Sequence, residues 1–328
     1  MTQATERRPA PNGRQVSPGR VETGAPPRTL APSGVRNGFF HWLGGLVLVA
    51  NRVRHGVRGY QTPRPFPTGQ ISRAVQYDLG VVEGWLNALR RYAGRDFSPQ
   101  GRSVLELGPG PDLGTGLILL SLDARAYHAL DVVDLALRAP RSLYDELLTH
   151  LEVDEATDRA SLRSEIDALL AGQYGRLRFV CDPRFDVRLF AGHDIDLVVS
   201  QAAFEHFENP GKVIAQLSEV VTPGAILVSE VDLQTHSRWL RDADPLNIYR
   251  FSDRVYDALR FAGSPNRWRP AEYVDSLRRN GWRDIEVTPV TVLEAAYVSR
   301  VQPTLNHQFR SRQDQMEVLH FVICARKA

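Results

Sequence analysis

From Ser103 onward, short apolar and β-branched runs alternate with stretches whose apolar residues recur every three or four positions. Runs of the first kind predict buried strands, and stretches of the second kind predict amphipathic helices. Seven strands are expected, at residues 103–107, 126–132, 176–181, 195–200, 225–231, 284–290 and 317–325. Such alternation is typical of a parallel sheet with helices on both faces.

The helical stretches have recognisable ends. The helix expected at 270–280 begins at Pro270 and stops before Gly281, the usual asymmetry of helix termini. Another, at 210–221, ends at a Thr-Pro-Gly turn. Residues 141–171 are rich in Leu, Glu and Asp and predict a helical insertion between the second and third strands.

The N-terminal part of the chain has a different composition. Residues 1–36 hold much Pro, Gly, Arg, Ser and Thr and almost no large apolar residue, so we expect a disordered tail. Residues 37–97 predict a helical extension, with its clearest periodicity at 69–94. Residues 98–328 then form the main domain.

No apolar run reaches the roughly 18 residues expected of a membrane-spanning helix. The nearest, residues 38–50, is interrupted by His41 and the Gly44-Gly45 pair, has arginines on both sides and lacks a small-residue cleavage site. We therefore expect a helix that packs on the domain or lies on a membrane surface, not an export signal.

Composition narrows the possible partners and compartment. The net charge of +2 gives no reason to expect a nucleic-acid partner. Cys181 and Cys324 both lie in predicted strands and form neither a disulfide framework nor a metal-ligand spacing. We expect buried thiols in a reducing cytoplasm.

The loop VLELGPGPDLGTG, residues 104–116, follows the first strand and predicts a nucleotide-binding turn. Gly108 and Gly110 fit the dinucleotide fingerprint, but Leu113 occupies the place of its third glycine. Glu106 would put a negative charge beside a pyrophosphate, which opposes binding. No Lys-Ser/Thr pair follows, which excludes a P-loop. A cationic nucleoside without phosphate, such as S-adenosylmethionine, resolves the conflict.

Several motifs follow in order: ALDVVDL (129–135), FVCDP (179–183), DLVVSQAAFEHFENP (196–210) and VVTPGAILVSE (220–230). With VLELGPG (104–110), they make residues 98–326 resemble the class I, Rossmann-like S-adenosylmethionine-dependent methyltransferases, of the small-molecule or polysaccharide-associated type. The resemblance implies an α/β fold: a Rossmann-like, seven-stranded, mostly parallel sheet with helices on both faces and an antiparallel last strand. The N-terminal helical extension would be added to it.

The resemblance also implies a set of cofactor contacts. Asp131 would bind both ribose hydroxyls or, as the alternative, would cap the following helix. Asp182 would bind the adenine amino group. The remaining expected contacts are Glu106, Gly108, Pro109, Gly110, Val132, Ser200 and Gln201. Asp112 stands where many family members have glycine, which leaves open whether it tightens the loop or contacts the cofactor.

Two carboxylate–histidine pairs follow the fourth and fifth strands. Glu205 and His206 would shape the pocket floor or take part in catalysis. His236, with its charge supported by Asp232, would take a proton from a substrate hydroxyl unless it is a surface histidine. The catalytic candidates are therefore His236, Asp232 and His206. Asp232 and His236 alone are too few ligands for a metal, so no metal site is expected.

Two further residues, Asn266 and Arg267, would line an acceptor pocket or fix a turn. The favoured function is O-methylation of a small-molecule or glycan-like acceptor. Two alternatives stay open: a non-catalytic binding protein with the same fold, and an NAD(P)-dependent oxidoreductase. Glu106 and Leu113 argue against the oxidoreductase, because its cofactor carries a pyrophosphate.

Overall fold

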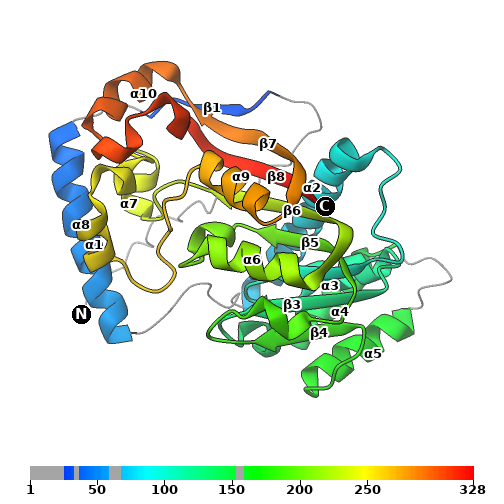
Figure 1. Cartoon of the computed structure of the whole chain (residues 1–328). Coiled ribbons are helices and arrows are strands. Elements are labelled where there is room, and N and C mark those ends of the chain that lie inside the picture. The colour runs from blue at the N-terminus through cyan, green and yellow to red at the C-terminus, as the bar shows by residue number, and fades with distance from the viewer. Residues whose placement is uncertain (1–25, 33–36, 59–67, 153–158) are drawn as a thin grey trace, which may run out of the picture.

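The computed structural model describes residues 26–32, 37–58, 68–152 and 159–328. Its centre is one sheet of eight strands (Figure 1). Across the sheet, their order is β1 (Arg28–Leu30), β7 (Trp282–Leu293), β8 (Val318–Lys327), β6 (Val221–Asp232), β5 (Ile195–Gln201), β2 (Ser103–Leu107), β3 (Ala126–Asp131) and β4 (Leu177–Cys181).

Strand directions confirm the expected fold class. β2 pairs in parallel with β3 on one side and with β5 on the other. After β3 and β4, the chain therefore crosses to the opposite side of β2 and forms β5 there. β8 is antiparallel to both of its neighbours, β6 and β7. All seven predicted strands are present. Because β2, β3, β4, β5 and β6 pair in parallel, their carboxyl ends lie at the same edge of the sheet.

The eighth strand corrects the prediction for the N-terminal tail. β1 lies inside residues 1–36, which were expected to be disordered, and pairs in parallel with β7 through Arg28 opposite Thr291. The carbonyl of Leu30 also accepts a hydrogen bond from the Glu294 amide. Its partners come from the far end of the chain, so local composition did not reveal the strand. Residues 1–25 and 33–36 lie outside the described part.

Helices cover both faces of the sheet because successive strand residues point to opposite sides. Val104 packs in a core with α2 (Ile71–Ala93), α3 (Gly114–Ser121), α4 (Arg141–His150) and α5 (Arg159–Leu170). Leu105, the next residue, packs in a second core with α6 (Pro210–Val220) and α9 (Pro270–Arg279). Figure 1 shows the two helical layers.

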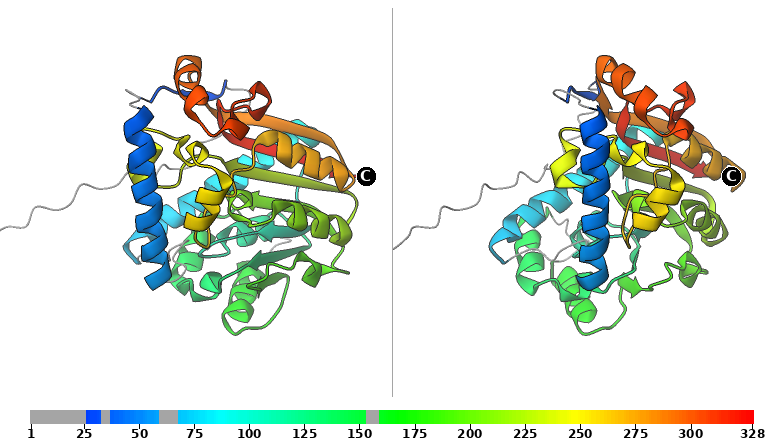
Figure 2. Two further views of the ribbon diagram at one scale, coloured as in Figure 1. Left: turned by 60° about the vertical axis from the view of Figure 1, so that its left-hand side comes forward. Right: turned by 90° about the vertical axis from the view of Figure 1, so that its left-hand side faces the viewer.

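The expected helical additions are present in the described residues. α4 and α5 lie between β3 and β4, as predicted for 141–171. α1 (Asn37–Arg58) and α2 form within 37–97. A third core joins α1 to η5 (Asn247–Arg250), α8 (Asp253–Leu259) and α10 (Ala295–Val301) beside the sheet (Figures 1 and 2).

Two further expectations concern membranes and thiols. Within the described residues, no helix combines the length and the apolar character needed to cross a membrane. Cys324 in β8 is a buried free thiol, as expected, but Cys181 is exposed. The expectation was wrong for Cys181 because β4 is an edge strand, and its last residue is not covered from both sides.

Candidate active site

The turn after β2 requires glycine at two positions. Gly108 has a φ of 72° and Gly110 a φ of 83°, values that side chains other than glycine rarely adopt. A Cβ atom on Gly108 would also lie 2.6 Å from the Ala203 Cβ. Half-buried Pro109 lies between the two glycines. The loop therefore brings its backbone against the segment that follows β5.

Asp112 tightens this loop. Its Oδ1 accepts a hydrogen bond of 2.9 Å from the Gly114 amide at the start of α3. Asp78, a buried acid on α2, lies against the same turn, and a side chain on Gly114 would collide with its carboxyl group. Burial, followed by the neighbouring Asp112, raises the pKa of Asp78 well above its usual value. Asp78 was missed, although it lies on the apolar face of a predicted amphipathic helix.

Glu106 acts on the loop from inside the protein. Its side chain is 2% exposed, and Oε2 accepts hydrogen bonds from the hydroxyls of Thr115, at 2.6 Å, and of Tyr127. Burial raises its pKa to about 7, against the opposing effect of these two hydrogen bonds. The carboxyl group thus holds the first turn of α3.

Asp131 joins the ends of β2 and β3. Its Oδ2 accepts a hydrogen bond of 3.2 Å from the Gly110 amide, and Oδ1 accepts one of 2.6 Å from the Val132 amide. The carboxylate therefore fastens the glycine loop and its own turn and does not cap a helix. The Val133 amide donates a third, longer hydrogen bond of 3.4 Å to Oδ1. Because a carboxylate offers about four acceptor sites, one is left for a ribose hydroxyl.

Two predicted cofactor contacts are used by the protein itself. The Asp182 carboxylate accepts hydrogen bonds from the amides of Arg184 and Asp186, at 3.3 and 2.9 Å, and closes the turn after β4. Ser200 is fully buried, and its hydroxyl donates to the Leu107 carbonyl at 2.9 Å. Ser200 therefore fastens β5 to the end of β2.

Gln201 differs from its neighbour Ser200. It is half-buried at the end of β5, and its Oε1 is a buried acceptor with no hydrogen-bond partner among the described residues. An unsatisfied buried oxygen is costly, so a donor from a ligand fits this position. The ammonium and the adenine amino group of S-adenosylmethionine are donors of this kind.

His206 and His236 come from different strand ends and meet with ring centroids 4.8 Å apart. His206 Nδ1 lies 2.6 Å from the Gly263 carbonyl, and His236 Nδ1 lies 2.9 Å from the Gln234 carbonyl. Because a carbonyl only accepts, each Nδ1 carries a proton and each neutral ring keeps a lone pair on Nε2. Burial, helped by His236, lowers the pKa of His206 to about 3, and burial also lowers the pKa of His236.

Asp232 is close to His236 but does not accept its Nδ1 proton, which goes to Gln234. Asp232 Oδ2 accepts a hydrogen bond of 2.5 Å from Arg241, and Oδ1 accepts one of 3.0 Å from the Gln234 amide. Burial raises the pKa of Asp232, but His236 and Arg241 outweigh it and leave the pKa lowered. Its support for a charged His236 is therefore electrostatic.

Glu205 completes a group of three possible metal ligands. Its side chain is 1% exposed, and neither carboxylate oxygen has a hydrogen-bond partner among the described residues. One ligand atom each of Glu205, His206 and His236 lies within 4.8 Å of the others. Burial, followed by Asp232, raises the pKa of Glu205 well above its usual value. The expectation of no metal site considered only Asp232 with His236.

Asn266 and Arg267 fix turns. The Asn266 side chain donates to the Phe204 carbonyl at 2.7 Å, and its amide donates to the Glu205 carbonyl at 2.7 Å. Arg267 is buried and donates to the carbonyls of Ile248 and Phe251. Asn266 thus positions the short helix η4 (Phe204–His206), which carries two residues of the site.

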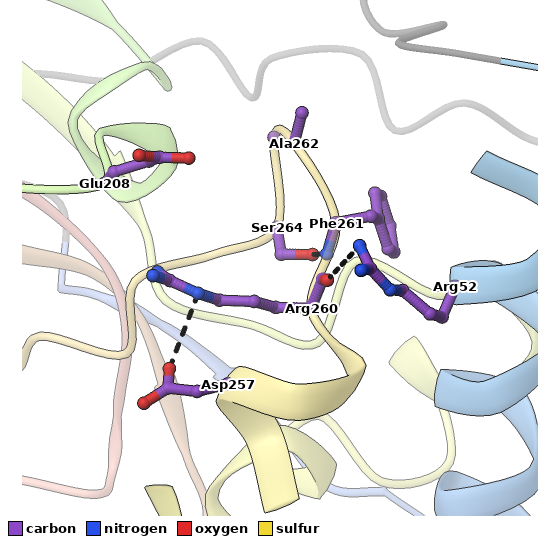
Figure 3. Close-up of a pocket in the computed structure, with 8 residues that line it drawn as sticks. Arg52, Glu208, Asp257, Arg260, Phe261, Ala262 and Ser264 are labelled. Carbon is purple, nitrogen blue, oxygen red and sulfur yellow. Dashed lines mark hydrogen bonds and ion pairs between the residues drawn. The ribbon is translucent and has the colours of Figure 1, made fainter. Parts of the chain in front are cut away.

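A pocket of about 230 Å³ lies between α1, Glu208 and the segment that follows α8 (Figure 3). Its lining includes four charged side chains, those of Arg52 on α1, Glu208, Asp257 and Arg260. It also includes Gly263, whose carbonyl holds His206 Nδ1. Gly263 thus links this polar pocket to His206, although neither histidine lines the pocket.

The family model described as "Methyltransferase domain" matches residues 78–287. The chain belongs to this methyltransferase family. It is a class I S-adenosylmethionine-dependent methyltransferase, and S-adenosylmethionine is its cofactor. Gly108, Gly110 and Asp131 at the strand ends, and the unsatisfied Oε1 of Gln201, fit that cofactor. The family argues against the oxidoreductase alternative.

Solved structures are similar at low identity. The CurJ carbon methyltransferase is 17% identical, with a TM-score of 0.46, covering 89% of this chain and 68% of its own. A methyltransferase from Mesorhizobium loti is 16% identical, with a TM-score of 0.41, and the match covers 75% of this chain and 100% of that protein's chain. Phosphoethanolamine N-methyltransferase 2 of Haemonchus contortus is 13% identical, with a TM-score of 0.41, and the match covers 83% of this chain and 55% of that protein's chain. No curated protein matches the chain.

Proposed function

We propose that this methyltransferase methylates a hydroxyl oxygen of a small-molecule or glycan-like acceptor, with His236 as the base. One observation carries the proposal: His236 Nδ1 donates to a backbone carbonyl, which leaves a lone pair on Nε2 beside His206. S-adenosylmethionine supplies the methyl group. The acceptor oxygen forms the new bond to carbon, the carbon–sulfur bond breaks, and the hydroxyl proton goes to His236 Nε2.

Two effects supply the acceleration. Holding acceptor and methyl group in line contributes up to roughly 7–11 kcal/mol. General-base catalysis contributes about 10²–10⁴-fold. Asp232 favours the protonated form of His236 through its negative charge. His206, half-buried on the same side, shapes the pocket floor.

The polar pocket that shares Gly263 with the His206 hydrogen bond supports this acceptor class. Arg52, Glu208, Asp257 and Arg260 present both signs of charge, which suits an acceptor rich in hydroxyl groups better than an apolar one. We expect no nucleic-acid partner, since the net charge is +2. A cytoplasmic location stays a prediction.

Binding distinguishes a methyltransferase from its alternatives. Calorimetry with S-adenosylhomocysteine and with NAD is expected to give binding of the first only. Asp131→Asn is expected to weaken that binding, and Asp134→Asn, with its exposed carboxylate, is the matched control. Binding of NAD alone would restore the oxidoreductase, and binding of neither ligand would contradict the cofactor site.

Methyl transfer is tested with methyl-labelled S-adenosylmethionine and a panel of saccharides, phenols and amines. Label is expected in hydroxyl compounds. His236→Ala should lower kcat by about 10²–10⁴-fold with unchanged affinity for S-adenosylhomocysteine. Label in amines only would refute O-methylation, unchanged kcat in the variant would refute the base, and binding without transfer to any acceptor would favour the non-catalytic alternative.

A further inference from the structure

We propose that Glu205, His206 and His236 bind a divalent cation of the Zn²⁺ type. Their ligand atoms come from η4 and from the segment after β6, and all lie within 4.8 Å of one another. Binding of the ion does not depend on the acceptor. Its role in the reaction rests on the proposed function, because the ion would hold the acceptor hydroxyl oxygen.

The Glu205 carboxylate is the first reason. It is 1% exposed, and both oxygens lack hydrogen-bond partners within the described part of the chain. A buried carboxylate without partners is costly unless a cation or several donors compensate. His206 and His236 use their Nδ1 protons on the carbonyls of Gly263 and Gln234, so Nε2 is the atom that each ring has free to bind a cation. A cation satisfies all three groups at once.

The histidine hydrogen bonds are the second reason. Metal-ligating histidines almost always donate their other ring nitrogen to a carbonyl or carboxylate, which fixes the tautomer. Both rings have this arrangement, with Nδ1 on the carbonyls of Gly263 and Gln234. The Asn266 amide donates a hydrogen bond to the Glu205 carbonyl, which fixes the backbone of the third ligand.

The ligand set defines the ion and its chemistry. Two imidazoles and one carboxylate, with a position left for an oxygen, are the ligands of catalytic zinc sites. Bonds of about 2.0–2.2 Å need ligand atoms about 3–3.5 Å apart, so the three side chains close around the ion. An acceptor oxygen in the open position would have a lowered pKa. His236 Nε2 cannot be ligand and base at once, so in the ion-bound protein the ion would replace His236 in favouring loss of the acceptor proton, and water would take that proton.

Cobalt titration tests the site directly. The full chain, first treated with EDTA, is titrated with Co²⁺ and followed by visible absorption, with Zn²⁺ as competitor. One equivalent is expected to bind. Glu205→Gln, His206→Ala and His236→Ala should each lose more affinity than the roughly 10–100-fold typical of outer-shell changes.

A second histidine pair supplies the control. His128 and His193 have ring centroids 4.7 Å apart, but His193 Nε2 lies 2.9 Å from the Arg178 guanidinium, whose positive charge opposes a cation there. His193→Ala should bind Co²⁺ like the unchanged protein. Absence of Co²⁺ binding, or undiminished binding by Glu205→Gln that still binds S-adenosylhomocysteine, would overturn the site. Failure of the proposed function has a different signature: Co²⁺ binds, but no hydroxyl compound is labelled.

A separate observation concerns α1. Six large apolar side chains recur along it at three- and four-residue spacing, and between 46% and 82% of each is exposed: Phe39, Trp42, Leu46, Val49, Val53 and Val57. This spacing places them on one face of the helix. Contiguous exposed apolar surface of this kind marks an interaction site.

The opposite face of α1 is fixed on the protein. Asn247 donates to the Phe40 carbonyl at 2.8 Å and fills the space beside Gly44. His55 stacks on Phe261 with ring centroids 3.9 Å apart, and Leu48 is buried. The apolar stripe therefore points outward along the whole helix, which lies lengthwise on the side of the molecule (Figure 2).

We infer that this stripe lies on an anionic membrane surface. Residues 1–64 contain ten arginines and only two acidic residues, although the whole chain has a net charge of +2. The sequence of α1 contains three arginines and no acid. One of them, Arg52, donates to the Arg260 carbonyl and faces the protein, whereas Arg54 is exposed next to Val53 of the stripe. Apolar burial combined with basic side chains is the pattern of helices that lie in the interface of anionic bilayers.

Vesicle sedimentation tests this inference. The chain is expected to sediment with phosphatidylglycerol–phosphatidylcholine vesicles, less so in high salt, and not with phosphatidylcholine alone. Val49→Glu with Val53→Glu should abolish sedimentation and leave S-adenosylhomocysteine binding intact. Leu189→Glu, at an apolar residue exposed elsewhere, is the control. Unchanged sedimentation of the double variant would overturn the inference, as would concentration-dependent dimerisation through α1 without vesicle binding.

Discussion

Gly108 and Ala203 approach so closely that a Cβ atom on Gly108 would lie 2.6 Å from the Ala203 Cβ. This contact joins the glycine loop after β2 to the segment that carries Glu205 and His206. Cofactor loop and acceptor side are therefore one packed unit, and a change at Gly108 acts on both.

We predict that Gly108→Ala lowers both stability and affinity for S-adenosylhomocysteine. The positive φ alone costs a non-glycine residue roughly 1–2 kcal/mol, and the collision with Ala203 adds to it. Gly192→Ala is the matched control, because Gly192 has a φ of 81° and open space around it. Urea unfolding and calorimetry should show a larger stability loss in Gly108→Ala, and reduced affinity only there.

The buried Glu106 predicts a pH dependence of stability. Its pKa is raised from the ordinary glutamate value of 4.5 to about 7 in the folded protein. The folded state therefore binds more protons, so stability falls as pH rises between these values, by about 3 kcal/mol in all. Glu106→Gln keeps an acceptor for Thr115 and lacks this titration. Thermal unfolding from pH 4 to 8 should show a steeper decline in the unchanged protein, and equal slopes would contradict the assignment.

Gln201 and Ser200 are adjacent but should respond oppositely. Ser200→Ala removes a buried hydrogen bond to the Leu107 carbonyl and should cost about 1 kcal/mol of stability, with unchanged cofactor affinity. Gln201→Met removes an unsatisfied buried oxygen, so the ligand-free protein should become more stable while affinity for S-adenosylhomocysteine falls. Equal affinities in all three proteins would remove Gln201 from the cofactor site.

The buried ion pair between Arg250 and Asp244 is predicted to anchor α1. Both side chains are at most 1% exposed, and Arg250 also donates to Asn37 at the start of that helix. Asp244→Asn leaves the guanidinium without its charge partner and should destabilise the protein by roughly 3–5 kcal/mol. Asp134→Asn, in the exposed pair with Arg138, should change stability far less in the same urea titration, because solvent screens that pair.

Much of the fold was predictable because its signals are local. Each of the seven predicted strands carries its own apolar run, and Pro270 marks the start of its helix. β1 was not predictable, since its hydrogen bonds come from β7, more than 200 residues away. The exposure of Cys181 likewise depends on β4 being at the sheet edge, which no local pattern encodes.

For the candidate site, the sequence by itself determined which residues stand at strand ends: the glycine loop, Asp131, and the two carboxylate–histidine pairs. Tertiary structure alone decided how they combine. It turned Glu106, Asp182 and Ser200 toward the protein's own backbone and side chains. It also brought Glu205 and His206, which follow β5, together with His236, which follows β6. Residue type and position along a strand are local properties, whereas the direction of a side chain and its partners depend on which strands become neighbours.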